Sequence, residues 1–348
     1  MNLTKSTLAN VAVGMITASS IIGAFSNPGV SFAASQKVYT IALANSYIGN
    51  GWRVEMEHVL EAEALMPGFK GKVNLKVENS ANSVSAQIAS IDNMIAAHVS
   101  AILVDAASPS GINAVIAQAH QQGIPVIAFD NNVTSPYAYN LVANQMKFGK
   151  IGATFLVHAL HGKGNIIMNR GVAGTPADIQ RAAGAMSVFK KYPGIHVVDQ
   201  IYGNWDPATT RQQFTTALAS YPNVDGLWSE GGTYGAIQAL LAEKHKLFPI
   251  AGEASNGFRM ALATLKNKGL TGISVGQPPF FSALALKYAI QILEGKKIPH
   301  TITVQSPVLT SSQIKIGVNA FPNLPSSTYD DFEGDGLKFT VQQMETGK

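Results

Sequence analysis

The sequence predicts an α/β protein of two Rossmann-like lobes, each built on a parallel sheet. Short runs that are mainly apolar, such as residues 37–44 and the continuously apolar 101–104, alternate with segments of helical spacing, of which residues 52–65 are the first. Continuous apolar runs are typical of parallel strands, which are buried on both faces. The alternation restarts near Asn144, and two sets of similar size without a long linker predict two lobes.

The individual elements follow from apolar spacing and turn residues. In the first set we expect strands at 37–44, 73–77, 101–104 and 126–129, and helices at 52–65, 83–97 and 112–121. In the second set we expect helices at 149–160, 175–190, 207–220, 233–243 and 258–267, and strands at 165–168, 197–202, 226–228, 249–251 and 272–275. A later helix at 281–293 and a strand at 301–304 are too few for a third domain. They are expected to return to the first lobe.

The expected organisation is therefore a first lobe of residues 37–144 plus 278–304 and a second lobe of residues 145–277 plus 305–320. From residue 321 to residue 348 the apolar runs give way to Pro, Ser, Asp and Gly. We expect this last segment to be a tail on the surface with one short helix at most.

Composition excludes several classes of protein. Hydrophobic residues make up 46% of the 348 residues and charged residues 13%, which allows a sizeable core and argues against disorder. The net charge is +4 and no Lys/Arg run exceeds two residues, so a nucleic-acid surface is not expected. The absence of cysteine excludes disulfides, thiolate metal sites and a cysteine nucleophile.

Residues 1–33 have the pattern of a secretory signal peptide. Lys5 precedes an apolar stretch at 8–25, and Ser31 and Ala33 place small residues before a cut at Ala34. The alternative is an uncleaved membrane anchor. Because no cysteine is available for a lipid anchor, the expected mature protein is free in the periplasm or secreted.

Polar and aromatic residues gather after the predicted strands, where the usable crevice of a parallel sheet lies. The candidate ligand-binding residues are Asn50, Trp52, Arg53, Asp130, Asn131, Arg181, Trp205, Glu230, Glu253 and Gln277. Indole rings can stack on the C–H face of a sugar, and planar carboxylate, amide and guanidinium groups can bind neighbouring hydroxyls. The set predicts a polyol site, although any single member could be a core tryptophan or a helix-capping aspartate.

Catalytic and metal-binding patterns are weak. The sequence has no G-x-S-x-G, Walker or G-x-G-x-x-G element. His158 and His161 stand at i and i+3 at the end of a predicted helix without a third ligand, so no metal and no cofactor are expected. Asp130, Glu230 and Glu253 could in principle form an acid/base pair for glycoside hydrolysis.

One acidic cluster imitates the start of a calcium loop. Asp331, Glu333 and Asp335 occupy loop positions 1, 3 and 5, but Gln342 stands where such a loop needs a bidentate glutamate. A solvated acidic tail is the simpler interpretation.

Five segments in the expected order resemble the type I periplasmic sugar-binding proteins of ABC importers, the ribose-binding group. They are residues 40–43, 50–53, 123–130, 171–176 with Arg181, and 276–278. The likeness spans roughly residues 37–310. It implies a non-enzymatic, monomeric protein with three crossovers between its lobes, hinges near Asn144, Gln277 and Gln305, and a sugar bound between the lobes. The sugar is then presented to a membrane permease, and a chemoreceptor is a further possible partner.

The resemblance also implies roles for single residues. Asn50 and Trp52 are expected to contact the sugar from the first lobe, and Trp205 from the second. Asp130 matches an acidic acceptor of hydroxyl hydrogen bonds, while Arg181 and Gln277 match the family pattern.

Departures from that pattern point away from ribose itself. The Trp52-Arg53 pair resembles the galactofuranose-binding branch, and Asn131 replaces an arginine. Glu230 and Glu253 stand where the ribose binder has Asn and Asp. Another furanose, a polyol or an amino acid stays open as the ligand. A regulator's effector domain shares this fold, but the signal peptide occupies the place of its DNA-binding helices.

Overall fold

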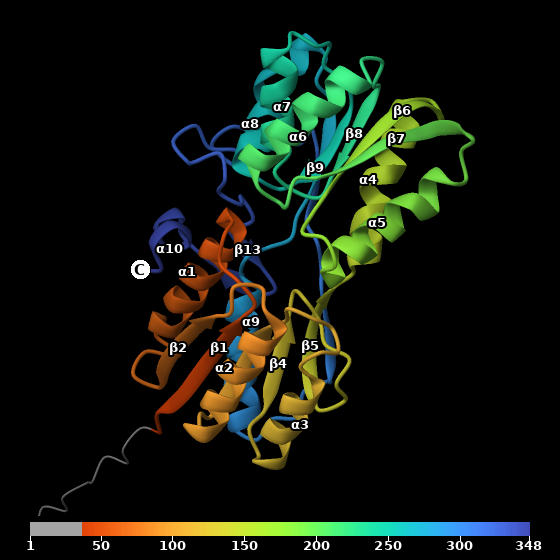
Figure 1. The fold of residues 1–348 in the computed structure, drawn as a ribbon. Helices are drawn as coiled ribbons and strands as arrows, with labels where there is room; N and C mark the ends of the chain where they lie inside the picture. Colours follow the sequence, from red (N-terminus) through yellow and green to blue (C-terminus); the bar gives the residue numbers. More distant parts are fainter. Residues whose placement is uncertain (1–36) are drawn as a thin grey trace, which may run out of the picture. The chain divides into compact units, whose positions relative to one another are not determined.

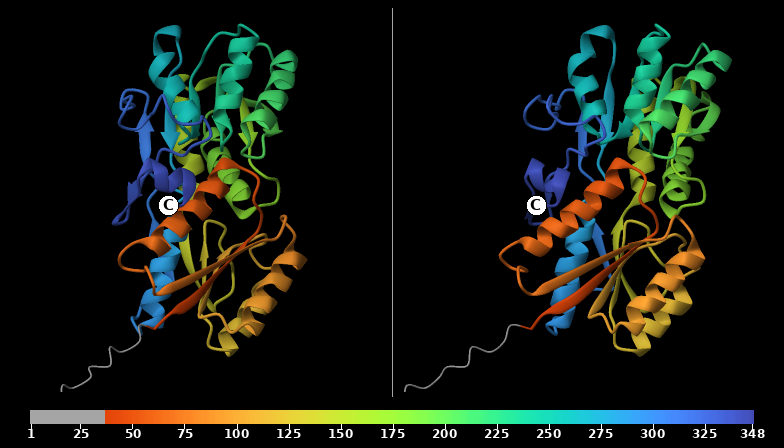
Figure 2. Two further views of the ribbon diagram at one scale, coloured as in Figure 1. Left: turned by 90° about the vertical axis from the view of Figure 1, so that its left-hand side faces the viewer. Right: turned by 60° about the vertical axis from the view of Figure 1, so that its left-hand side comes forward.

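The computed structural model describes residues 37–348, whose strands form two six-stranded sheets and one two-stranded hairpin (Figure 1). The predicted signal peptide lies outside the described residues. Each large sheet has helices on both faces, which is the predicted α/β architecture (Figures 1 and 2).

The first sheet has the strand order β11-β5-β4-β3-β1-β2, and all its neighbouring strands are parallel. Its strands are β1 (Tyr39–Asn45), β2 (Val73–Asn79), β3 (Ala101–Asp105), β4 (Val126–Phe129), β5 (Ala138–Ala143) and β11 (Thr301–Val304). The helices of this lobe are α1 (Gly51–Leu65), α2 (Val84–Ala96), α3 (Asn113–Gln121) and α9 (Phe281–Leu293). In β1, Ile41 and Leu43 pack into one core, with residues of α1 and α9, while Ala42 and Ala44 face a second core with residues of α2 and α3.

The second sheet has the order β12-β10-β9-β8-β6-β7 and is parallel except for the edge strand β12. Its strands are β6 (Lys163–Arg170), β7 (Gly194–Tyr202), β8 (Gly226–Ser229), β9 (Ile250–Glu253), β10 (Gly272–Val275) and β12 (Val308–Thr310). Its helices are α4 (Gln145–Ala159), α5 (Pro176–Phe189), α6 (Pro207–Ser220), α7 (Thr233–Ala242), α8 (Asn256–Thr264) and the 3₁₀ turn η1 (Lys266–Lys268).

The chain passes between the two sheets three times along these strands. It leaves the first sheet after β5, returns between β10 and β11, and enters the second sheet again at β12. Most predicted strands and helices are present. The sequence pattern missed β5 and β12, because Tyr139 and Asn140 interrupt the apolar run of β5 and β12 is only three residues long.

The prediction of a tail on the surface was wrong for residues 321–348. This segment contains β13 (Glu333–Gly334), β14 (Leu337–Lys338) and α10 (Val341–Thr346), and α10 lies beside α1 (Figures 1 and 2). Tyr329, Leu337, Phe339 and Met344 are buried in the core shared with α1 and α9. Their apolar side chains are spread through polar sequence without a helical or strand period, so the pattern did not reveal them.

The acidic cluster of that segment does not converge on one point. Asp331 is buried and forms an ion pair with Arg259 at 2.7 Å, whereas Glu333 is exposed and pairs with Lys338 at 2.9 Å. Among residues 37–348 no group of three or more His, Asp or Glu side chains is placed to hold a metal ion. None of the helices in that range is long and apolar enough to cross a membrane.

Candidate ligand-binding site

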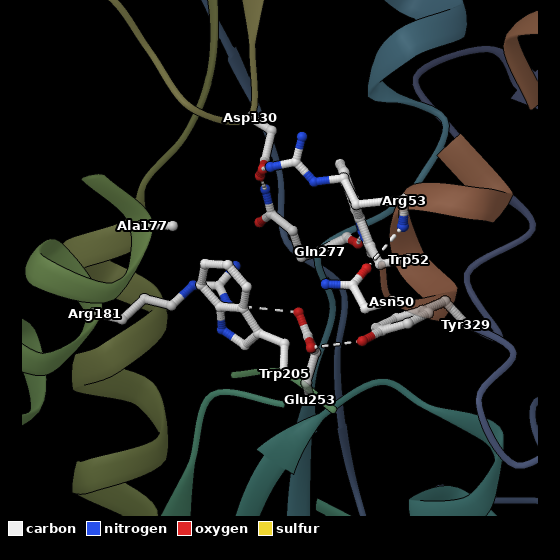
Figure 3. A pocket seen from close by; sticks show the side chains of 10 residues that line it. All are labelled: Asn50, Trp52, Arg53, Asp130, Ala177, Arg181, Trp205, Glu253, Gln277 and Tyr329. Carbon is white, nitrogen blue, oxygen red and sulfur yellow. Dashed lines mark hydrogen bonds and ion pairs between the residues drawn. The ribbon is translucent and has the colours of Figure 1, made fainter. Parts of the chain in front are cut away.

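A pocket lies where strand ends of both sheets meet (Figure 3). Its lining side chains come from both lobes and from the C-terminal segment, and they point toward one another. They are Asn50, Trp52, Arg53, Asp130, Ala177, Arg181, Trp205, Glu253, Gln277 and Tyr329.

The first lobe contributes the N-terminal turn of α1. Asn50 caps this helix, because its side chain accepts a hydrogen bond from the backbone N–H of Arg53 at 2.9 Å. The cap fixes Trp52 and Arg53 in the first turn. Trp52 is buried, and its indole N–H donates to the carbonyl oxygen of Gln277 at 2.5 Å. The segment between β10 and α9 is thereby joined to α1.

Arg53 is held by a buried ionic network. Its guanidinium forms an ion pair with Asp105, donates to the Asn45 side-chain oxygen at 2.6 Å and lies 3.8 Å from an Asp130 oxygen. Burial raises the pKa of Asp105 to about 7, and Arg53 opposes that rise. The arginine therefore fits a fixed wall of the pocket whose charge is already matched.

Asp130 follows β4 in the left-handed backbone region, with φ at +55°. This turn directs its carboxylate to Gln277, whose side-chain amide donates to it at 2.6 Å. Asn131 lies behind this pair: its amide donates to Asp130 at 3.1 Å and to Asp105 at 2.9 Å. Asn131 thus orients both carboxylates without lining the pocket.

In the second lobe, close packing of α4 against α5 positions Arg181. A Cβ on Gly149 would lie 1.9 Å from the Arg181 carbonyl oxygen, so the two helices can approach this closely only with glycine there. The approach brings the Arg181 side chain to Gln145, which accepts its Nε–H at 2.7 Å, and to the Phe148 ring, whose centroid is 4.1 Å from the guanidinium carbon.

Glu253 ends β9 and is bonded from two sides. One of its oxygens lies 3.5 Å from an Arg181 nitrogen, and the other accepts the Tyr329 hydroxyl at 2.9 Å. Burial raises the pKa of Glu253 to about 7, with the charge of Arg181 acting in the opposite direction.

Trp205 follows β7 with φ at +57°, and Asp206 caps α6 directly after it. The Trp205 indole N–H donates to Glu230 at 3.3 Å. A Cβ on Gly171 would lie 2.1 Å from the indole, so this glycine makes room for the ring at the pocket. Glu230 is fully buried behind the indole, and that burial raises the pKa of its carboxyl well above the usual range.

Eight of the ten residues predicted from the sequence line the pocket, and Asn131 and Glu230 lie behind it. Two lining residues, Ala177 and Tyr329, were missed. Ala177 lies in the first turn of α5, directly after residues 171–176, which carry part of the family resemblance. No sequence signal links Tyr329 to the site. The acid/base alternative loses one of its three carboxylates, since Glu230 does not reach the pocket.

Comparisons with known proteins agree with this architecture. Residues 41–297 match the family model described as "Periplasmic binding protein domain". A ribose import binding protein of Bacillus subtilis is 25% identical over 276 residues, covering 78% of this chain and 88% of its own. A xylitol-binding protein of Mycolicibacterium smegmatis is also 25% identical, covering 78% of this chain and 77% of its own.

Among solved structures, an ABC transporter solute-binding protein of Thermobispora bispora superposes with a TM-score of 0.70 at 29% identity. The match covers 77% of this chain and 84% of that one. The fold prediction is confirmed, as is the prediction of a binding protein rather than an enzyme. The family model spans well over half of the chain, and the protein belongs to the periplasmic binding protein family.

Proposed function

We propose that this protein is an exported receptor that captures a small neutral sugar or polyol in the pocket and delivers it to an ABC importer. The observation that carries the proposal is the composition of one pocket. Two indoles, Trp52 and Trp205, lie in it beside the planar side chains of Asp130, Arg181, Glu253 and Gln277. Apolar ring faces and planar hydrogen-bonding groups together suit a sugar or polyol.

The charge balance supports a neutral ligand over an amino acid. Arg53 is paired with Asp105, and Arg181 has Glu253 as its carboxylate neighbour. An amino acid would need an unmatched cation for its carboxylate and an unmatched anion for its ammonium. A polyhydroxylated ligand needs only the remaining lone pairs and N–H groups, which these paired side chains still offer.

The relatives support a ligand of five or six carbons. The relatives named above for ribose and xylitol bind molecules of that class, and the ligand here is proposed to belong to it. The Trp52-Arg53 pair suggests a furanose, and the ligand panel below therefore includes furanose-forming sugars.

Delivery follows from closure of the lobes about the three crossing segments, near Asn144, Gln277 and Gln305. A sugar that bonds both walls stabilises the closed form by its differential affinity, and the importer's permease then receives it. Residues 1–33 are proposed to direct export to the periplasm. A chemoreceptor is a second possible recipient of the closed form.

Tryptophan fluorescence tests the proposal directly, because the chain has three tryptophans and the structure separates them. Trp52 and Trp205 line the pocket, while Trp228 is buried in the second lobe and donates to the Gly149 carbonyl. We expect a saturable emission change on titration with at least one of a panel of pentoses, hexoses, furanose-forming sugars, pentitols and inositols.

Single Trp→Phe variants supply the control. Trp52→Phe and Trp205→Phe should each reduce the ligand-linked change, whereas Trp228→Phe should lower total emission and leave that change intact. If no member of the panel alters emission or thermal stability, while an amino acid does, the sugar assignment is wrong.

A further inference from the structure

Residues 321–348, here named the C-terminal strap, are fastened to the second lobe at the start of α8. The Asn256 side chain donates to the carbonyl oxygens of Phe321, Leu324 and Pro325 at 2.9–3.2 Å and accepts the Phe321 N–H at 2.8 Å. One turn later, Arg259 donates to the Asp330 carbonyl at 3.0 Å. These bonds, of which those of Asn256 are partly buried and that of Arg259 is buried, fix residues 321–330 on this lobe.

The same strap is fastened to the first lobe. Glu55 of α1 accepts the backbone N–H of Tyr329, with both carboxylate oxygens at 3.0 Å. Farther along, α10 packs beside α1 with Met344 fully buried, and Thr340 begins α10 with a capping box. The strap thus spans both lobes in addition to the three crossings made by the sheets.

Tyr329 stands between these two anchors and turns its ring into the pocket (Figure 3). It is 4% exposed, and its hydroxyl donates to Glu253 at 2.9 Å. Because that proton is engaged by Glu253, the lone pairs of the phenol oxygen are free to accept a hydrogen bond from a ligand hydroxyl. The ring, held at its backbone by Glu55, closes one side of the space left for the ligand.

We propose that Tyr329 is a specificity-determining residue of the binding site: it accepts a ligand hydroxyl, orients Glu253 and limits ligand size with its ring. The inference rests on the proposed function and assigns a ligand contact to the strap. Tyr329 lies outside the part of the chain that matches the family model, since the matched region ends at residue 297.

Isothermal titration of the full chain with D-ribose, xylitol, D-galactose and myo-inositol tests this role. Tyr329→Phe keeps the ring and removes the hydroxyl, so we expect about a tenfold weaker affinity for the best-bound member. Tyr329→Ala opens the wall, and the affinity ratio of six-carbon to five-carbon members should rise about tenfold or more.

A matched control is Tyr39→Phe, because Tyr39 is also buried but lies at the start of β1 in the core and does not line the pocket. It should bind as the wild type does. Thermal unfolding without ligand checks that Tyr329→Phe stays folded, so a weaker affinity of that variant reports the lost hydroxyl.

The possible failures are distinguishable. If the wild type binds a member of the panel and both Tyr329 variants bind it with unchanged affinity and unchanged size preference, the role of Tyr329 is wrong and the proposed function stands. If the wild type binds none of the four and none of the wider panel, the proposed function fails, and the inference fails with it.

Discussion

The two buried arginines of the pocket are held in different ways. Arg53, in the first lobe, is tied by charge: it contacts Asp105 directly and has Asp130 nearby. Arg181, in the second lobe, is tied mainly by a neutral amide and a ring, with Glu253 at 3.5 Å. An arginine in direct ionic contact with a carboxylate belongs to the framework of its lobe, whereas an arginine whose carboxylate partner is 3.5 Å away keeps N–H groups for a ligand hydroxyl.

We call Arg53 with Asp105 the first wall of the pocket and Arg181 with Glu253 the second wall. Substitutions in the first wall should mainly lower the free energy of unfolding, and substitutions in the second wall should mainly weaken ligand binding. The largest expected effect is that of Arg53→Met. Removing one partner of a buried ion pair leaves the others without compensation and costs about 3–5 kcal/mol. Arg181→Met should lower the free energy of unfolding by about 1 kcal/mol, since it leaves one carboxylate at 3.5 Å rather than two without a cation, but weaken ligand affinity about a hundredfold.

Urea unfolding at pH 7 and ligand titration measure the two quantities. The double variant Arg53→Met with Asp105→Asn should recover part of the lost stability, because it also removes the stranded carboxylate. If both arginine variants lower the free energy of unfolding equally and weaken ligand affinity equally, the proposed difference between the two walls is wrong.

A smaller effect is expected from the packing of the second wall. Gly171→Ala places a methyl group within 2.1 Å of the present Trp205 indole position, so the ring has to shift. We expect about 1–2 kcal/mol of lost stability and at least tenfold weaker ligand affinity. Gly68→Ala is the control: a Cβ there meets nothing within 4 Å, and both quantities should stay at the wild-type value. An unchanged affinity for Gly171→Ala would mean that Trp205 does not bear on the ligand.

The sequence predicts the features of the fold that follow from local patterns, and it does not predict those that depend on contacts between residues far apart along the chain. Buried parallel strands show as continuous apolar runs, so both sheets and their strand ends could be placed, and with them most pocket residues. The face on which a residue leaves its strand end is not encoded locally. For this reason Asn131 and Glu230 were expected to contact ligand but lie behind the carboxylates and the indole.

The C-terminal strap shows what the local sequence does not predict. Tyr329 reaches the pocket only because Asn256 and Glu55, each more than 70 residues away along the chain, hold its segment in place. No period, turn or spacing near residue 329 carries that information. The polar composition that suggested a solvated tail instead supplies the hydrogen-bonding groups that fasten it.

The last expected effect concerns pH, and it has the same sign in both walls. Burial raises the pKa of Glu253 from its usual value of 4.5 to about 7. The folded protein therefore binds a proton there that the unfolded chain has released, and stability falls as pH rises from about 4.5 to about 7. Asp105 in the first wall adds a fall of the same sign, since burial raises its pKa to about 7 as well.

Glu253→Gln should keep the hydrogen bond from Tyr329 and remove the contribution of Glu253 to the fall in stability with pH. Relative to the wild type, the variant should therefore gain about 1–2 kcal/mol of stability between pH 5 and pH 8. The slope that remains is shared by the other carboxyls whose pKa burial raises, among them Asp105, Asp330, Glu55 and Glu230, and Asp105→Asn should remove part of it. Glu333→Gln is the control, because this side chain is 67% exposed and its ion pair with Lys338 lies at the surface. Thermal unfolding midpoints measured at several pH values give the slopes. A Glu253→Gln slope equal to that of the wild type would mean that Glu253 stays ionised in the folded protein at pH 5, because Arg181 offsets the effect of its burial.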